Sequence, residues 1–208
     1  MYENYVVTIN RQFGSGGRRI GKRLSEALGI HYMDKELLAL AAQKSGISEK
    51  LFEHADEKPT NSLLYSLSAA AYGGYAVPLS FKDVLTNDKL FAIQAEVIRS
   101  TAKERSCIMI GRCADDILSD HPHHLNVFIH APLPVRVKTV AERHGLSEKA
   151  AEELILKTDK RRASYYNFYT SRKWDSSLHY DLTIDSSLLG EDGPAEYLKQ
   201  LVFLAFDK

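Results

Sequence analysis

The feature that most limits the fold is a glycine-rich loop near the start of the chain, between an expected strand and an expected helix. Residues 5–10 (YVVTIN) are β-branched and apolar, which is typical of a buried strand. The loop RQFGSGG occupies 11–17, and residues 18–29 carry apolar side chains at helical spacing. A loop in this position directs backbone N–H groups and the positive end of the helix dipole at one spot. The sequence therefore predicts a phosphate-binding site at residues 14–19.

The loop does not follow the standard phosphate-loop pattern G-x-x-x-x-G-K-[ST]. Only Gly16 matches; Arg11 stands at the first glycine, Gly17 at the lysine and Arg18 at the hydroxyl residue. A plain strand-to-helix turn is the alternative interpretation. We expect the donor phosphates to be held by Gly14, Ser15, Gly16, Gly17, Arg18 and Arg19. Arg18 or Arg19 is expected to supply the charge of the absent lysine.

The rest of the chain alternates between short apolar runs and amphipathic segments. Further strands are expected at 30–33, 107–111, 125–130 and 180–185, and helices at 35–45, 48–57, 87–105, 134–144, 147–170 and 194–206. Asp34, Ser48 and Ser147 are expected to cap helices. Short helices are expected within 59–85. This alternation predicts an α/β fold with a parallel sheet covered on both faces, in a single domain over 1–208.

The composition argues against two functional classes, nucleic-acid binding by bulk charge and membrane insertion. The chain has 208 residues, with 27 basic and 27 acidic side chains, so nucleic-acid binding by bulk charge is not expected. Residues 59–81 carry no charge, but prolines and glycines interrupt them, so no membrane span is expected there. No secretory leader is expected, and the two cysteines, Cys107 and Cys113, suit a reducing compartment. A cytoplasmic location is the resulting expectation.

Four segments together resemble one known family. Residues 6–34 look like the opening of cytidylate kinases, and more closely that of the cytidylate kinase-like proteins. The resemblance resumes at Ile110-Gly-Arg112, at 127–131 and at 181–186. It implies a three-layer P-loop fold with a five-stranded parallel sheet in the order 2-3-1-4-5 and helices on both faces.

The same resemblance implies a lid and leaves residues 55–90 uncovered. A helical lid is expected at 157–174. A variable helical insertion is expected at 55–90, as a candidate acceptor-binding region.

The resemblance also implies a reaction and a set of residues. The γ-phosphoryl group of ATP, with Mg²⁺, would pass to a nucleoside monophosphate or another small acceptor. Residues assigned to catalysis are Arg18, Arg19, Arg161 and Arg162; those assigned to the substrate are Asp34, Arg112, Asp115, Asp159 and Tyr165. Asp34 is also the candidate magnesium contact, through water. For Arg112, a salt bridge to a neighbouring helix is the alternative to an acceptor-phosphate clamp.

One departure bears on specificity. The acid that follows Gly-Arg in cytidylate kinases, used for base recognition, is Cys113 here, so cytosine specificity is not implied. Asp115 and Asp116 are candidate replacements, or simply a solvated helix start.

Two other functional classes remain open. The absent lysine and magnesium hydroxyl favour a nucleotide-binding sensor or regulator without catalysis. Residues 157–173 hold six basic side chains, one acid and four aromatics, a composition that also suits RNA binding. The histidines of 121–124 are interpreted as a surface turn rather than a zinc site. Small nucleotides are the expected partners, with no membrane.

Overall fold

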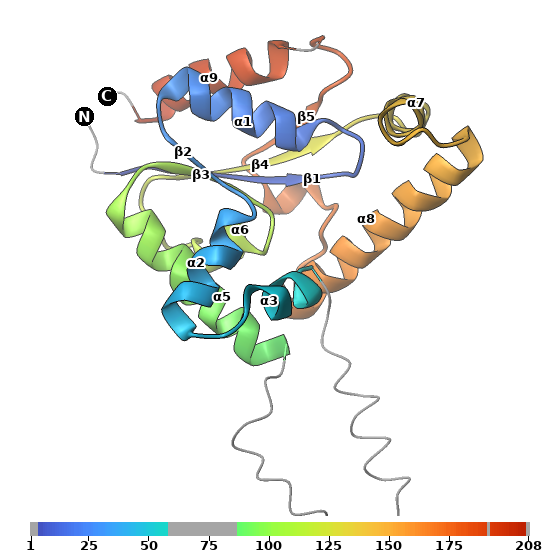
Figure 1. Cartoon of the computed structure of the whole chain (residues 1–208). Helices are drawn as coiled ribbons and strands as arrows, with labels where there is room; N and C mark the ends of the chain where they lie inside the picture. The colour runs from blue at the N-terminus through green and yellow to red at the C-terminus, as the bar shows by residue number, and fades with distance from the viewer. Residues whose placement is uncertain (1–3, 58–86, 191, 207–208) are drawn as a thin grey trace, which may run out of the picture.

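The computed structural model describes residues 4–57, 87–190 and 192–206. Five parallel strands form one sheet in the order β2-β3-β1-β4-β5 (Figure 1), which confirms the predicted order 2-3-1-4-5. The strands are β1 (Val6–Arg11), β2 (His31–Met33), β3 (Cys107–Ile110), β4 (His124–His130) and β5 (Leu182–Asp185). All six residues of the central strand β1 are buried, as expected for a parallel strand covered on both faces.

Helices form a layer on each side of the sheet (Figure 1). On one face, α1 (Gly17–Leu28) and α9 (Gly193–Phe206) pack on apolar side chains of β1, β3 and β4. On the other face lie α2 (Glu36–Ser45), α3 (Glu49–Ala55), α5 (Asn87–Glu104) and the short α6 (Ala114–Ile117). Helices α1 and α9 therefore bury their apolar sides against the sheet, whereas α3 packs on α2 and α5.

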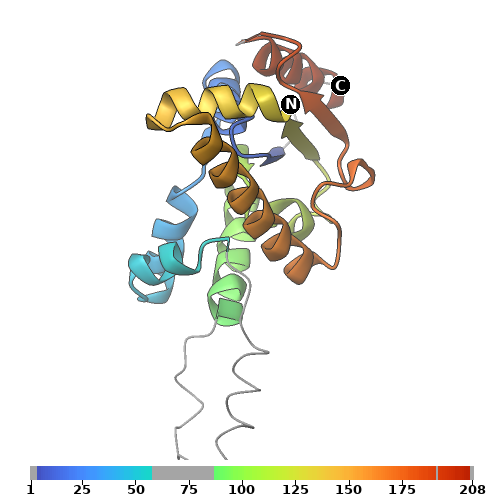
Figure 2. The same cartoon turned by 90° about the vertical axis from the view of Figure 1, so that its right-hand side faces the viewer.

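Two helices stand beside the carboxyl ends of the strands. Helix α7 (Leu133–His144) packs on α8 (Glu148–Thr170), and Figure 2 shows α8 running obliquely past this edge of the molecule. The Ser147 hydroxyl accepts a hydrogen bond from the backbone N–H of Ala150, which confirms the predicted cap. A short 3₁₀ helix (Ser177–His179) precedes β5.

One predicted cap was wrong, and a second was right in position but makes no side-chain hydrogen bond. Lys35, not Asp34, occupies the N-cap position of α2, and no side chain caps that helix. Ser48 stands at the N-cap of α3 without a side-chain hydrogen bond, and α3 ends at Ala55 rather than at Glu57. The Asp34 carboxylate is instead bound by two arginines, since charged donors attract it more strongly than neutral N–H groups.

Most of the predicted insertion at 55–90, including the helices expected at 59–85, lies outside the described residues. Within the described part of the chain, no helix is long and apolar enough to cross a membrane.

Candidate active site

The glycine loop lies at the carboxyl edge of the sheet, between β1 and α1 (Figure 1). Gly14 and Gly16 adopt φ values of 84° and 80°, a left-handed conformation that glycine accepts without strain. A Cβ on Gly14 would lie 2.9 Å from Cγ2 of Val140, so α7 closes directly on the loop. The first N–H groups of α1 have no acceptor within their own helix and favour an anion there.

Ser15 fastens the loop to the sheet through its side chain. Its hydroxyl is positioned to donate to the carbonyls of Gln12 and Ile129, with oxygen–oxygen distances of 2.8 and 3.1 Å. Its own carbonyl accepts a 2.8 Å hydrogen bond from the Ser186 hydroxyl. The hydroxyl of Ser15 is thus directed into the protein, and its backbone N–H donates to the carbonyl of Gln12 at 3.3 Å.

Arg11 occupies the space that the standard loop lysine would need. A Cβ on Gly17 would lie 2.6 Å from Cβ of Arg11 and 3.0 Å from its Cγ. The Arg11 side chain then passes beneath Gly111, at the end of β3. The two departures from the standard pattern, an arginine at 11 and a glycine at 17, are therefore sterically coupled.

Arg18 and Arg19 are both exposed but lie on different sides of the loop. Arg18 pairs with Asp34 at the end of β2, with 2.8 Å between its Nε and Oδ2 of the carboxylate. Nη2 of Arg19 would lie 3.8 Å from a Cβ on Gly16, which places this guanidinium near the loop itself. Successive helical side chains diverge by about 100°, so the two residues face different groups.

A second feature of the site is a buried carboxylate held by two arginines. Oε1 of Glu57 lies 2.8 Å from Nη1 of Arg11, and its Oε2 lies 3.0 Å from Nε of Arg162. Burial acts to raise the pKa of Glu57, but Arg11, Arg162 and Arg112 outweigh it and hold the pKa well below its usual range. For Arg162, burial and the charge of Arg11 lower the pKa to about 10. This arrangement joins β1, α8 and the end of α3.

Arg112 is the centre of an adjoining cluster. Its Nη1 lies 3.0 Å from Oδ1 of Asp34, and its Nη2 lies 2.9 Å from Oδ2 of Asp56. Burial acts against its charge, but Asp56 and Asp34 outweigh burial and raise the pKa of Arg112. Burial raises the pKa of Asp56, against the opposing effect of Arg112. Arg112 thus makes salt bridges at the position where the sequence predicted an acceptor-phosphate clamp.

Asp159 ties the predicted lid helix to the glycine loop. Its Oδ1 accepts a 2.7 Å hydrogen bond from the backbone N–H of Phe13, and its Oδ2 lies 2.7 Å from Nη1 of Arg136. Arg136 also donates to the carbonyl of Phe13. Arg162, one turn further along α8, donates to the carbonyl of Arg11. The position of the loop is therefore coupled to that of α8.

Asp115 and Asp116, which follow β3, differ in burial and in hydrogen-bond partners. Asp115 is buried and accepts hydrogen bonds from Asn10, at 2.9 Å, and from the hydroxyl of Tyr166, at 2.6 Å. Burial raises the pKa of Asp115, and these two bonds oppose the shift. Asp116 is half-buried and pairs with Arg172. Both side chains have protein partners, so the alternative interpretation, in which they are merely solvated at the start of a helix, does not describe them.

Cys113 and Tyr165 belong to a buried cluster that also contains Phe128, Trp174 and Tyr180. Burial raises the pKa of the Cys113 thiol and that of the Tyr165 hydroxyl well above their usual values. Both groups therefore stay protonated near neutral pH. Tyr165 also lines a small internal space with Arg11, Glu57 and other residues of the clusters above.

The predicted lid positions divide into exposed and buried residues. Arg161 is exposed, whereas Arg162, Tyr165 and Tyr166 are buried. Arg162 also lies over the Phe13 ring, 5.7 Å from its centroid. The basic and aromatic side chains of 157–173 thus do not share one exposed face.

Sequence reasoning did not assign site roles to Arg11, Asp56, Glu57 or Arg136. The signal for Arg11 was its place at the end of the central strand, where ligands of parallel sheets bind. Asp56 and Glu57 belong to the region predicted to form the acceptor site, but no pattern set them apart there. Their roles emerge only from contacts between residues far apart in the sequence.

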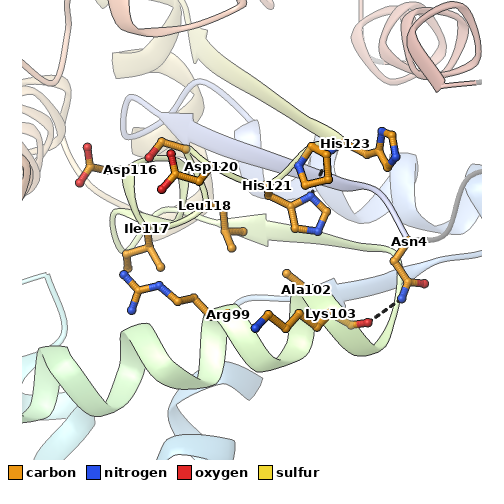
Figure 3. Close-up of a pocket in the computed structure, with 12 residues that line it drawn as sticks. Asn4, Arg99, Ala102, Lys103, Asp116, Ile117, Leu118, Asp120, His121 and His123 are labelled. Carbon is orange, nitrogen blue, oxygen red and sulfur yellow. Dashed lines mark hydrogen bonds between the residues drawn. The ribbon is translucent and has the colours of Figure 1, made fainter.

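A separate hollow lies at the opposite, amino edge of the sheet, away from the glycine loop (Figure 3). It has a volume of about 940 Å³. Its lining includes Arg99 and Lys103 of α5 and His121 and His123 of the turn before β4. None of the predicted phosphate-binding residues lines it. Among the described residues, no group of three or more His, Cys, Asp or Glu could hold a metal ion.

Comparison with known proteins places the chain in a family. The model of the cytidylate kinase-like family matches residues 6–188. A cytidylate kinase from Methanosarcina barkeri is 30% identical over 184 residues, which cover 86% of each chain. A cytidylate kinase from Pyrococcus furiosus is 31% identical over 203 residues, covering 95% of this chain and 88% of the relative.

Solved structures agree on the fold. An uncharacterized protein from Eubacterium ventriosum superposes with a TM-score of 0.67 at 28% identity, over 99% of both chains. A shikimate kinase from Bacteroides thetaiotaomicron, at 11% identity, gives a TM-score of 0.51 over 98% of this chain and 99% of its own. With its five-stranded P-loop fold and this match over most of its length, the chain belongs to the cytidylate kinase-like family.

Proposed function

We propose that this protein transfers the γ-phosphoryl group of ATP to a nucleoside monophosphate. One observation carries the proposal: the guanidinium groups of Arg11, Arg112 and Arg162 converge beside a glycine loop at the carboxyl edge of a parallel sheet. Phosphoryl transfer needs positioned positive charge more than it needs a reactive side chain. Family membership, with relatives named as cytidylate kinases, supports the same reaction.

In this proposal the donor phosphates lie against the backbone of Gly14–Gly17 and the first turn of α1. Arg19 lies near the loop to meet them, and Arg18 lies beside Asp34 on the acceptor side. Arg112, Asp159 and Tyr165 remain the proposed acceptor-side residues. Arg161 and Arg162 on α8, in the proposed lid over 157–174, would stabilise charge that develops during transfer.

Mg²⁺ would be carried mainly by the phosphates of the nucleotide and by water, since magnesium keeps several waters and needs few protein ligands. It would neutralise phosphate charge during transfer. Both oxygens of Asp34 are within hydrogen-bonding distance of a guanidinium, so a contact through water suits this residue better than a direct bond.

The identity of the acceptor base is a separate question. Cys113 is buried and protonated, and Asp115 already binds Asn10 and Tyr166. Neither offers a free carboxylate like the one that cytidylate kinases use for base recognition. We therefore propose the class of acceptor, a nucleoside monophosphate, and test its base directly.

The test incubates the protein with ATP, Mg²⁺ and each of CMP, dCMP, UMP, AMP and GMP, and measures ADP. We expect ADP above the no-acceptor blank with at least one of them. Arg112→Lys keeps the positive charge but cannot make bidentate hydrogen bonds to a phosphate. This variant should raise KM for the acceptor at least about tenfold, while KM for ATP stays within about twofold. The control is Arg105→Lys, at an exposed arginine before β3.

A second candidate function is nucleotide sensing without transfer. The absent loop lysine and the inward-facing hydroxyl of Ser15 favour it. ATP binding in calorimetry with no ADP formed from any acceptor would support this function and contradict the kinase.

A further inference from the structure

The carboxylate of Glu57 lies between the guanidinium groups of Arg11 and Arg162, close to the glycine loop. Arg11 comes from the strand that leads into the loop, and its Cβ and Cγ pack under Gly17. Arg162 donates to the carbonyl of Arg11 and stacks over Phe13, also in the loop segment. The side chains of Arg11, Arg162 and Glu57 are 4%, 7% and 9% exposed, so water solvates none of these charges well.

The donors around Glu57 outnumber the acceptors that it provides. Among the described residues, Nε of Arg11 and Nε of the adjacent Arg112 are buried without a hydrogen-bond acceptor, whereas a single acceptor of this cluster, Oδ1 of Asp56, is buried without a donor. Leaving such donors unpaired is unfavourable, because they have lost their hydrogen bonds to water. A carboxylate has two oxygens, whereas a phosphoryl group has three and more negative charge. The site therefore has donor capacity for a phosphoryl group that the Glu57 carboxylate does not fill.

The backbone at Glu57 is also held in an unfavourable conformation. Its φ is 51°, in the left-handed region that is unfavourable for a residue with a Cβ. The preceding helix α3 is only seven residues long. The two arginine contacts hold Glu57 in this conformation, so a competing anion that takes over those contacts would release it.

We propose that Arg11 and Arg162 form a phosphoryl-binding site, and that Glu57 is its internal occupant until a phosphoryl group of the substrate displaces it. Arg11 thereby supplies, from the end of β1, the positive charge that a lysine at 17 supplies in the standard phosphate-loop pattern. The identity of the ligand as a nucleotide phosphate rests on the proposed function. The exchange of one anion for another does not require transfer, and inorganic tripolyphosphate tests it alone.

The first test is calorimetry with tripolyphosphate, without Mg²⁺, at constant ionic strength. Glu57→Gln keeps the shape of the side chain and removes the competing charge, so it should bind tripolyphosphate at least about tenfold more tightly than the natural protein. Glu53→Gln, at an exposed position of α3 just before Glu57, is the matched control and should change nothing. Adding Arg11→Met to Glu57→Gln should remove the gain.

The second test uses the natural chain, so it does not depend on a variant that folds. Saturating tripolyphosphate should speed hydrogen–deuterium exchange of the amides of α3, because displacement of Glu57 frees the end of that helix. Unchanged or slower exchange in α3 overturns the proposal, and so does equal affinity of the Glu57→Gln and natural proteins. A gain in affinity without any ADP formation from ATP would leave the anion site standing and remove the kinase.

Discussion

The side chain of Arg11 fills the space into which a side chain on Gly17 would extend. A Cβ at position 17 would lie 2.6 Å from the Arg11 Cβ, closer than such atoms approach in proteins. A lysine at 17 and an arginine at 11 therefore exclude each other in this backbone. The lysine of the standard phosphate-loop pattern therefore has no room at position 17 while Arg11 keeps this conformation.

Gly17→Ala should lower the free energy of unfolding by roughly 1–3 kcal/mol through overpacking. Replacing glycine in a helix by alanine otherwise stabilises by up to about 1 kcal/mol. In an Arg11→Gly background the same change should therefore become neutral or stabilising. Urea denaturation of the four proteins of this cycle measures the coupling, and additive effects would show that the two residues do not compete for space.

Arg18 and Arg19 should contribute differently to ATP binding. Arg19 lies near the glycine loop, so Arg19→Ala should weaken ATP binding at least about tenfold, the value of one charged hydrogen bond. Arg18 pairs with Asp34, so Arg18→Ala should leave ATP affinity within about twofold. Calorimetric titration checks both, and small equal losses would mean that neither replaces the lysine.

Arg162 and its neighbour Arg161 form a matched pair for stability. Arg162→Ala removes one of the two partners of buried Glu57 and should cost about 3–5 kcal/mol. Arg161→Ala, at an exposed position one residue away, should change stability by less than about 0.5 kcal/mol. Chemical denaturation distinguishes them; similar losses would show that the Glu57 contact is not what stabilises this part of α8.

Because it leaves the fold intact, Arg161→Ala is the clean test of the proposed lid. If Arg161 acts on charge that develops during transfer, turnover should fall by up to about three orders of magnitude while ATP affinity changes little. Steady-state kinetics and calorimetry give the two quantities. Unchanged turnover would make this side of α8 a solvated basic face.

Stability should also depend on pH through His124. Its Nε2 lies 2.7 Å from the Thr8 hydroxyl, and burial lowers its pKa from 6.5 to about 4. Between these values the unfolded chain binds a proton that the folded chain excludes, so stability is present above pH 6.5 and is lost as the pH falls toward 4. The loss attributable to this group is at most about 3 kcal/mol.

His124→Gln keeps a nitrogen near the Thr8 hydroxyl and removes the titration. Urea denaturation at several pH values should give a flatter curve for this variant between pH 6.5 and 4 than for the natural protein. If the free energy of unfolding falls equally with pH in both proteins, groups other than His124 cause the loss of stability in acid.

The order of the strands followed from the resemblance to cytidylate kinases, and most of the helices followed from the apolar spacing along the chain. Residues 5–10 read as a buried strand because a central parallel strand must be apolar toward both layers, and β1 is buried along its whole length. Ser147 was predicted as a cap from local chemistry alone, and it caps α8. Asp34 is by residue type an equally good N-cap, but its carboxylate binds Arg112 and Arg18 instead. Contacts across the fold outweigh the local preference here.

The sequence by itself determined the glycine loop, its place between strand and helix, and the departures at 11 and 17. Those features depend on spacing along the chain, which the sequence displays directly. Only the tertiary structure decided that Arg11 occupies the space that a lysine at 17 would need. It also placed Glu57 between Arg11 and Arg162. Finally, it buried Arg162 and left Arg161 exposed. Glu57 lies 46 residues from Arg11 and 105 from Arg162, and no local pattern shows which distant charges the packing of α3 and α8 will bring together.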